Sequence, residues 1–495
     1  MPDSPMAHPA EVAVPPAGPR DSALPAGTRL RGDPSLEWVS DTLVAGGSPW
    51  RLVRLTVNGA GLLAAWLDGA PVSSAPADGA LARRLVGAAI VHPVRAAREV
   101  HPGEVDVVVP VRNDVHGLEA VLRVVSRSPA VGVTVVDDGS TDPWAVARVA
   151  DAHQAQLVRH DLPLGPGAAR NAGLRATTAP VVAFLDADAL PAADWLEVLV
   201  PYLDDPAVGA VAPRVRGPQG PGVKERFEAA ASPLDLGDQR GVVRPGAAVP
   251  FVPAAALVAR RAALGEGFDA SLRTGEDVDL IWRLVASGWE VRYEPSVTVT
   301  HAARSTWRGW LAQRFAYGMS AAPLEARHGD AAAPLRADPR VLATLGLVLA
   351  GRPRAAAGLL SWSASSLARQ LDGVSARGGN QAAARQLAAR GTALAAPGLA
   401  RSAFRAYGPL LLAAAVALPP VRRPVATLTV AATAVRWWRA GRPTPRTAFA
   451  ALSLVDDLAY GAGVLAGAVC ARRVGALRPR LRPTVRVAAP PISRT

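Results

Sequence analysis

A short apolar run that ends in two carboxylates constrains this chain more than any other stretch. Val181–Leu185 is β-branched and aromatic, which predicts a buried strand, and Asp186-Ala187-Asp188 follows it directly. Because side chains repeat every second residue along a strand, Asp186 and Asp188 can face one pocket. Carboxylates this close repel each other unless a cation separates them, and a divalent cation that carries a diphosphate meets that need. An isolated Asp-x-Asp is also typical of a solvated turn.

Further apolar runs predict a sheet whose strands alternate with helices. Strands are expected over residues 105–113, 131–136 and 157–158, with a helix over 117–126. This alternation favours an α/β fold, a mostly parallel sheet sandwiched by helices. Ligands bind at the carboxyl ends of the strands in such sheets. Besides the Asp186 segment, two strands lead there into candidate binding residues: Pro110, Val111, Arg112 and Asn113 after one, and Asp137, Asp138 and Gly139 after the other.

A glycine-rich segment lies between the third and fourth predicted strands. Gly165-Pro166-Gly167 precedes a helix that carries Arg170 and Asn171. Helix N-terminal amides favour anions, an arginine can grip a phosphate with two hydrogen bonds, and an asparagine can bind a sugar or a base. A plain helix start with a surface arginine explains the same residues equally well.

An acidic pair and a histidine follow later in the chain. Glu276 and Asp277 are predicted at the start of a helix that runs to about residue 287 and buries Leu280, Ile281 and Leu284. Acidic residues are common at helix starts, where they complement the dipole. His301 follows two short predicted strands, 291–293 and 297–300. A lone histidine is more often structural, but this one could complete a cation site with Asp188.

The distribution of charge bears on the partners of the chain. The net charge is +13, which invites a nucleic-acid hypothesis, but residues 421–495 hold thirteen Arg against two Asp, and that part alone accounts for +11. Basic side chains beside the most apolar part of the chain indicate a membrane surface and no nucleic-acid partner. A single Cys470 excludes a disulfide framework and places the soluble part in the cytoplasm.

The apolar stretches of the C-terminal half are unusual for spanning helices. Residues 341–350, 355–362, 409–420 and 424–437 are each too short to span, and 449–471 is long enough but contains Asp456 and Asp457. We expect interfacial or re-entrant helices rimmed by Arg and Trp. Multi-pass insertion and a soluble helical bundle are the alternatives. A helix over 307–317 carries Trp310, Arg314 and Tyr317, which suit the wall of a sugar cleft or a membrane-facing seam.

Five regions are expected from these patterns. Residues 1–27 form a disordered tail, 28–97 a small α+β module, 102–325 the α/β domain, 335–475 an apolar helical membrane-associated region and 476–495 a basic tail. The small module, with a strand hairpin, two helices and a closing strand at 88–92, resembles the winged-helix PqqD-like domains that bind precursor peptides. A cap that only packs on the next domain is the alternative.

The combined motifs resemble a known family. Val-Val-Pro-Val-Arg-Asn, Val-Val-Asp-Asp-Gly-Ser, Gly-Ala-Ala-Arg-Asn-Ala-Gly-Leu, Phe-Leu-Asp-Ala-Asp and Gly-Glu-Asp-Val-Asp-Leu occur over residues 105–301 in the usual order of family-2 glycosyltransferases with the GT-A fold. The arrangement of the whole chain more narrowly resembles the glycosyltransferases of the mycofactocin system. The resemblance implies an inverting transfer of glucose or a similar hexose from a nucleotide-diphosphate sugar, UDP-glucose, to the peptide-derived redox cofactor or its precursor, with a short oligosaccharide as a further product.

The resemblance also implies roles for the candidate residues. The segment Pro110, Val111, Arg112 and Asn113, together with Asp137, Asp138, Gly139, Arg170, Asn171 and Ala187, would bind the nucleotide, one of the two adjacent aspartates accepting a hydrogen bond from uracil. Asp186 and Asp188, joined by His301, would hold Mg²⁺ or Mn²⁺ on the diphosphate. Asp277 would be the general base, with Glu276 as the alternative.

Two other functions fit the sequence. We expect the chain at the cell membrane, with its catalytic domain on the cytoplasmic side. The apolar C-terminal region also favours a transferase of lipid-linked or cell-envelope glycans. A non-catalytic peptide-binding scaffold is a third reading, which the intact acidic pairs oppose. Gln313-Arg314-Phe315 departs from the Gln-x-x-Arg-Trp of processive synthases, so a channel-forming synthase is disfavoured.

Overall fold

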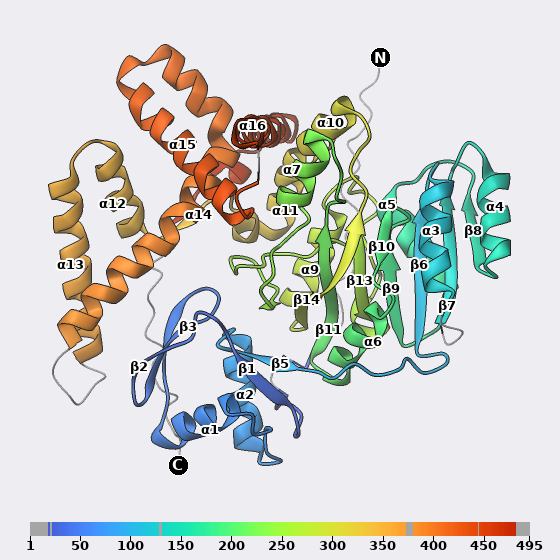
Figure 1. Ribbon diagram of the computed structural model, residues 1–495, viewed down its shortest axis with the longest axis horizontal. Coiled ribbons are helices and arrows are strands. Elements are labelled where there is room, and N and C mark those ends of the chain that lie inside the picture. The colour runs from blue at the N-terminus through green and yellow to red at the C-terminus, as the bar shows by residue number, and fades with distance from the viewer. Residues whose placement is uncertain (1–17, 20–21, 128–130, 373–379, 444, 482–495) are drawn as a thin grey trace. The chain divides into compact units, whose positions relative to one another are not determined.

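The computed structural model describes residues 18–19, 22–127, 131–372, 380–443 and 445–481 (Figure 1). Within these residues the chain divides into two compact units. The first comprises the described residues within Met1–Pro34, Leu62–Gly220 and Ser232–Ala303, and the second those within Ser35–Gly61, Pro221–Ala231 and Arg304–Thr495. The expected disordered tail falls mostly on residues 1–17, and the expected basic tail mostly on 482–495, and both stretches lie outside the described residues.

A mixed sheet forms the centre of the first unit. Among the described residues it has nine strands in the order β10-β14-β11-β13-β9-β6-β7-β8, with β12 paired to β14. The β9-β6-β7-β8 part is parallel throughout, as predicted, whereas β13 runs antiparallel between β9 and β11. The strands are β6 (Val105–Val111), β7 (Val131–Asp138), β8 (Gln156–His160), β9 (Val181–Leu185), β10 (Ala189–Pro191), β11 (Val208–Arg216), β12 (Gly241–Val242), β13 (Ala256–Arg260) and β14 (Glu290–His301).

The two strands predicted before His301 are one long strand, β14. Its pairing with β11 shifts register between Pro213 and Arg214, where the partners change from Glu294 to Thr298. This irregularity interrupts the apolar alternation, which is why the sequence pattern predicts two strands. The continuous strand carries His301 to the edge at which β10 pairs with it, Ala189 opposite His301.

Helices flank the sheet of the first unit (Figure 1). They are α3 (Val115–Val125), α4 (Pro143–Ala152), α5 (Pro166–Ala176), α6 (Trp195–Leu199), η1 (Val200–Asp204), α8 (Arg261–Leu264) and α9 (Glu276–Ala286). The Asp114 side chain caps α3 by accepting a hydrogen bond from Gly117 N at 2.9 Å. Leu280, Ile281 and Leu284 of α9 are fully buried, which confirms the predicted inward face of that helix.

The N-terminal region contains the predicted hairpin, helices and closing strand. β2 (Glu37–Ser40), β3 (Leu43–Gly46) and β4 (Arg51–Arg54) form an antiparallel sheet within the second unit. β1 (Arg29–Gly32) pairs with β5 (Val91–Val94), which lies slightly later than the strand predicted at 88–92. The helices are α1 (Val57–Leu67) and α2 (Pro76–Gly87). The independence of this region as a domain stays a prediction.

Helices make up most of the second unit. They are α7 (Val223–Ala231), α10 (Trp307–Met319), α11 (Ala321–His328), η2 (Gly329–Ala332), α12 (Pro339–Leu349), α13 (Pro353–Asp372), α14 (Asn380–Ala417), η3 (Pro419–Val421), α15 (Arg422–Arg439), α16 (Arg446–Cys470) and η4 (Gly475–Leu477). A short parallel pair, β15 (Arg336–Ala337) with β16 (Arg480–Leu481), completes the unit. The helical C-terminal region is thus confirmed. Its helices are longer than the apolar stretches in the sequence.

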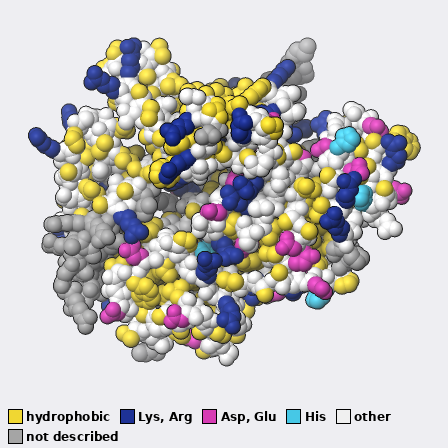
Figure 2. Space-filling model, in the orientation of Figure 1, with side chains coloured by type: hydrophobic (Ala, Val, Ile, Leu, Met, Phe, Trp, Pro, Cys, Tyr) yellow, Lys and Arg dark blue, Asp and Glu magenta, His cyan; other side chains and the backbone are white. Residues whose placement is uncertain are grey.

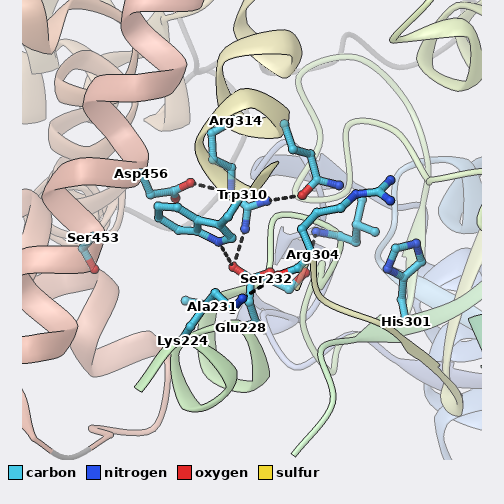
Figure 3. Close-up of polar contacts among 12 residues, drawn as sticks. Lys224, Glu228, Ala231, Ser232, His301, Arg304, Trp310, Arg314, Ser453 and Asp456 are labelled. Atoms are coloured by element: carbon cyan, nitrogen blue, oxygen red, sulfur yellow. Dashed lines mark hydrogen bonds and ion pairs between the residues drawn. The ribbon is translucent and has the colours of Figure 1, made fainter. Parts of the chain in front are cut away.

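The interior of the second unit holds a network of charged side chains. Arg314 lies between Glu228 and Asp456, with its Nε 2.7 Å from Asp456 Oδ1 (Figure 3). Trp310 Nε1 donates to Glu228 Oε1 at 2.7 Å. Trp310 and Arg314 are each 1% exposed, so the expectation that they line a cleft wall or a membrane-facing seam is wrong. They are interior residues because the carboxylates of α7 and α16 pair with Arg314 and with the Trp310 indole.

Candidate functional site

The carboxyl ends of three parallel strands meet at one edge of the central sheet. Val111 at the end of β6 lies opposite Asp137 of β7, and β9 pairs with β6 on its other side. After β9 the chain is held by a hydrogen bond from Asp186 N to Ala255 O, at 2.9 Å. Parallel pairing therefore brings the polar segments that follow Pro110, Val136 and Leu185 to a common edge, as predicted.

Asp186, Asp188 and His301 come together as a possible cation site. Each offers one ligand atom, and these atoms lie within 4.8 Å of one another. The Ala302 amide donates to the Asp188 carbonyl at 2.9 Å, which holds the two strand ends together. The three side chains are partly exposed, at 24%, 23% and 13% respectively, so an ion can reach them.

The hydrogen bonds of His301 are compatible with a cation at this position. His301 Nδ1 lies 3.0 Å from the Ala302 carbonyl oxygen, and Nε2 lies 3.2 Å from Asp188 Oδ1. Histidines that bind a metal through one ring nitrogen commonly donate the other to a backbone carbonyl. Two carboxylates and one imidazole are a donor set that fits Mn²⁺ or Mg²⁺.

Arg170 joins the Asp-x-Asp segment to the acidic helix start. Its Nη2 donates to Asp186 Oδ1 at 2.7 Å and its Nη1 to Glu276 Oε1 at 2.8 Å. The guanidinium also lies over the ring of Phe268, 5.3 Å from the centroid, and the residue is only 4% exposed. Two of its nitrogens are thus already bonded within the protein, and Arg170 orients both carboxylates.

Glu276 and Asp277 have different surroundings although they are adjacent. Gly275 adopts a φ of 86° before α9, a left-handed conformation that glycine accepts without strain. Glu276 is 6% exposed and bonded to Arg170, whereas the Asp277 side chain is partly exposed. Asp277 Oδ1 accepts from Val278 N at 2.8 Å and its Oδ2 from Ala254 N at 3.4 Å. Asp277 is therefore the carboxylate of this pair that an incoming molecule can reach.

Both carboxyl groups hold their protons more tightly than usual. Burial, and next the charge of Asp277, raise the pKa of Glu276 to about 7, although Arg170 opposes this. Burial likewise raises the pKa of Asp277, again against the attraction of Arg170. A carboxylate with a raised pKa is a stronger base at neutral pH than an ordinary one, which suits proton transfer.

The two aspartates after β7 are buried and bonded. Asp137 accepts from Ser140 N at 2.9 Å and pairs with Arg159. Asp138 Oδ1 lies 2.9 Å from His160 Nδ1 and from Leu164 N, and its Oδ2 accepts from Gly165 N at 2.8 Å. These bonds tie the end of β7 to the glycine-rich segment that starts α5.

The segment after β6 is shaped by Asn113. This residue has a φ of 60°, and its N donates to Ser140 Oγ at 2.9 Å, while its Oδ1 accepts from Thr141 N at 2.8 Å. Val111 is buried, Pro110 half-buried and Arg112 exposed. Gly139 has a φ of 71°, and a Cβ there would lie 2.7 Å from Pro163 N. The two strand ends therefore form one cross-linked loop pair.

Asn171 and Ala187 lie beside these groups. Asn171 Nδ2 donates to Phe268 O at 2.7 Å and its Oδ1 accepts from Phe268 N at 2.8 Å, so the side chain ties α5 to the segment before Asp269. Ala187 is 6% exposed, between the two aspartates of the cation site.

Comparison with known proteins identifies the family. The model of glycosyl transferase family 2 matches residues 106–268. A protein named pre-mycofactocin glycosyltransferase, from Mycobacterium tuberculosis, is 37% identical over 488 residues, which cover 93% of this chain and 99% of that protein. The chain belongs to glycosyltransferase family 2. It is therefore an enzyme that transfers a glycosyl group.

Other relatives of this glycosyltransferase match a smaller part of it. An uncharacterised glycosyltransferase from Mycobacterium bovis is 35% identical over 191 residues, 38% of this chain and 81% of that protein. Among solved structures, a mannosyltransferase from Pyrobaculum calidifontis in complex with GDP-Man and Mn²⁺ aligns with 23% identity and a TM-score of 0.36, over 70% of this chain and 91% of that one.

Two further residues at the candidate site of the glycosyltransferase are missing from the sequence prediction. Arg159 and His160 end β8, where they lie opposite Asp137 and Asp138 in the parallel register and pair with them. A signal was present, because they follow Leu157 and Val158 at the carboxyl end of a predicted strand. The signal is weak, because Leu157 and Val158 are the only apolar residues of this five-residue strand.

Proposed function

We propose that this glycosyltransferase transfers glucose, or a similar hexose, from UDP-glucose to the peptide-derived redox cofactor mycofactocin or its precursor, with inversion at the anomeric carbon. The acceptor rests on the name of a relative that matches nearly the whole chain. The observation that carries the donor half of the proposal is the cluster of Asp186, Asp188 and His301 beside the acidic pair of α9. We further propose a GT-A-type arrangement of the catalytic domain and, as products, short oligosaccharides.

The donor would bind at the edge of the sheet. Asp186, Asp188 and His301 would hold Mg²⁺ or Mn²⁺, which neutralises charge on the departing diphosphate. The nucleoside would lie against the loops after β6 and β7, lined by Pro110, Val111, Arg112, Asn113, Asp137, Asp138, Gly139 and Ala187. Because the carboxylates of Asp137 and Asp138 are largely bonded internally, we assign them mainly to fixing the shape of this pocket. Arg170 and Asn171 act on the nucleotide through the segments that they position.

Asp277 is the general base of the proposed reaction. The acceptor hydroxyl oxygen attacks the anomeric carbon as the bond from that carbon to the diphosphate oxygen breaks, and the electron pair leaves with the nucleotide. Asp277 takes the hydroxyl proton, because its side chain is partly exposed and its pKa is raised by burial. Glu276 is less suited, since it is buried and bonded to Arg170. No protein nucleophile is needed for a single displacement.

The N-terminal region and the C-terminal helices give the proposal its cellular setting. We propose that the small PqqD-like winged-helix region receives the peptide part of the acceptor. The enzyme would work at the cell membrane with its catalytic domain on the cytoplasmic side. One helix among the described residues, α16, is long and apolar enough to cross a membrane, and 39% of its most apolar window is buried.

A second candidate function is glycosyl transfer to a lipid-linked or cell-envelope acceptor. It is favoured by the large apolar side chains that the second unit exposes, among them Val416 and Val430. A purely peptide-binding scaffold without catalysis is disfavoured, because the carboxylates required for donor binding and for proton transfer are all present and positioned.

Mass spectrometry of small molecules from cells with and without the protein tests the proposal. Hexose-sized mass differences on a tyramine-like redox compound are expected. Differences confined to lipids would support the second candidate instead. Cells that carry the Asp277→Asn variant serve as the matched control, since they make the protein but should lack the hexose-bearing compounds.

A further inference from the structure

The apolar helix α16 packs against other helices of the second unit along one part of its surface. Its Gly463 packs so closely on α10 that a Cβ there would lie 2.1 Å from the Phe315 carbonyl oxygen. Gly461 of the same helix packs on α14, where a Cβ at Gly461 would lie 2.7 Å from Pro409 Cδ. Two of its glycines therefore fit against two different helices, and α16 contacts protein where a helix alone in lipid would contact acyl chains.

The two carboxylates of α16 are neutralised by neighbouring helices. Asp456, 0% exposed, pairs with Arg314 of α10 at 2.7 Å and with Arg436 of α15 at 2.6 Å. Asp457 pairs with Arg405 of α14 at 3.0 Å. Separating α16 from these partners would leave two buried charges unpaired, which is costly in any apolar medium. The helix that passes a length and composition test for membrane spanning is thus bound into a protein bundle.

The turn between α14 and α15, in contrast to the paired carboxylates of α16, exposes apolar side chains. We call residues 416–423 the hairpin tip. Val416 is 78% exposed and Leu418 54% exposed, and Ala417, Pro419 and Pro420 between and beside them are exposed as well. Five consecutive apolar residues in water form an unfavourable surface unless something apolar covers them.

The hairpin tip ends in two basic side chains. Arg422 and Arg423 follow Val421 and are both exposed, and Arg422 donates to the carbonyl oxygens of Ala415, at 3.0 Å, and Val416, at 3.3 Å. The sequence holds no Asp or Glu between Asp372 and Asp456. At the other end of α15, Trp438 is 63% exposed and Arg442 lies over its ring at 3.8 Å. Figure 2 shows Lys and Arg side chains among hydrophobic ones over the part of the molecule that Figure 1 labels α15.

We propose that the hairpin tip inserts into an anionic lipid surface and that α16 does not cross the bilayer. The apolar residues of the tip enter the acyl boundary, while the exposed Arg423 reaches the lipid phosphates, which are complementary in charge. Trp438 and its partner Arg442 are of the residue types that favour the interface. This inference rests on the membrane location given under the proposed function and names the element responsible for it.

Flotation of the full-length protein with vesicles tests the assignment. Wild-type protein should float with vesicles that contain phosphatidylglycerol and bind pure phosphatidylcholine more weakly. The double substitution Val416→Asp and Leu418→Asp removes two apolar side chains and should lower the partition coefficient by more than about tenfold. Arg423→Gln should lower it about fivefold on the anionic vesicles alone.

Val469→Asp on α16 is the matched control, because Val469 is 76% exposed and so nearly equals Val416 in type and exposure. It should float like wild type, and alkaline carbonate should release the protein from membranes. Two results would overturn the assignment in favour of a spanning α16. One is a wild-type protein that resists release by carbonate, and the other is a Val469→Asp variant that no longer floats while the tip variant still does.

If wild-type protein does not float at all, the membrane location itself is wrong. UDP-glucose consumption by each variant is measured separately, so failure of the transferase proposal is distinguished from failure of this one.

Discussion

Arg170 and Glu276 lie 106 positions apart in the chain and form a buried ion pair, with 2.8 Å between Nη1 and Oε1. The same guanidinium reaches Asp186 with its other terminal nitrogen. One cation therefore fixes the proposed metal-binding aspartate and the residue beside the proposed base. The proposed cation site and the proposed base are thus joined through one buried guanidinium.

Replacing Arg170 is expected to disturb both the Asp186 segment and the start of α9. Arg170→Met leaves two carboxylates without their cation, and should reduce the free energy of unfolding by about 3–5 kcal/mol. Urea unfolding of the purified protein measures this loss. Arg175→Met, an exposed position on the same helix, is the control and should change stability little. Equal effects of the two substitutions would contradict the role assigned to Arg170.

Asp277→Asn should separate binding from catalysis. The amide keeps the shape of the side chain but is a far weaker proton acceptor, so turnover should fall by about 10²–10⁴ while UDP affinity changes by less than about threefold. Steady-state transfer assays and UDP titration calorimetry measure the two quantities. Asp151→Asn, an exposed position on α4, provides a matched substitution. Near-normal turnover of Asp277→Asn would exclude it as the base.

Removing Asp188 should weaken donor binding through the metal. Asp188→Ala deletes one of three ligand atoms that lie within 4.8 Å, so UDP affinity in the presence of Mn²⁺ should fall about tenfold or more. When a chelator is present, calorimetry should show little difference in UDP affinity between the variant and the wild type. Asp194→Ala removes an exposed carboxylate nearby and should retain the full effect of Mn²⁺. A loss of affinity that is the same with and without Mn²⁺ would argue against a metal at this site.

The raised pKa of Glu276 predicts how stability changes with pH. In the unfolded chain this carboxyl titrates near its ordinary pKa of 4.5, whereas burial raises the pKa to about 7 in the folded protein. The folded state therefore binds the proton more tightly. This stabilisation is complete below about pH 4.5 and is lost as pH rises through about 7, by up to about 3 kcal/mol.

Urea unfolding of metal-free protein across this pH range measures the effect. Glu276→Gln cannot ionise at this position, so its free energy of unfolding should fall less steeply with rising pH than that of wild type. Parallel pH profiles of the two proteins would show that Glu276 is not the group responsible.

The helical unit should depend on Arg314. Arg314→Met leaves Glu228 and Asp456 buried with one partner fewer, which should cost about 3–5 kcal/mol. Arg308→Met on the same helix is the control, because Arg308 is exposed. Hydrogen exchange of the backbone amides of α10 and α16 measures the loss of stability in these two helices. Unchanged protection in Arg314→Met would mean that the network contributes no stability.

Much of the catalytic unit follows from local patterns in the sequence. Val181–Leu185 is found as the strand that its β-branched and aromatic residues predict, and α9 buries the leucine and isoleucine face that its periodicity predicts. The order of strands and helices is sufficient to bring Asp137 and Asp186 to one edge, because parallel strands carry their carboxyl ends to the same side.

The partners of charged side chains could not be predicted in this way. Arg170 bonds Asp186 and Glu276, partners that the sequence did not indicate, and Arg314, which was expected at a cleft or lipid seam, is buried beside Asp456. The Arg170–Glu276 and Arg314–Asp456 pairs join residues more than a hundred positions apart, and Arg170 and Asp186 lie in different segments of the fold. No local periodicity contains that information.

The sequence by itself determined the family, the order of the elements and the carboxylates at the strand ends. The tertiary structure alone decided that Asp277, rather than Glu276, is accessible, and that Asp456 and Asp457 are paired inside a bundle while Val416 and Leu418 are exposed. The physical reason is that backbone pattern is set by neighbouring residues, whereas the protonation, accessibility and pairing of a charge depend on what distant segments place around it.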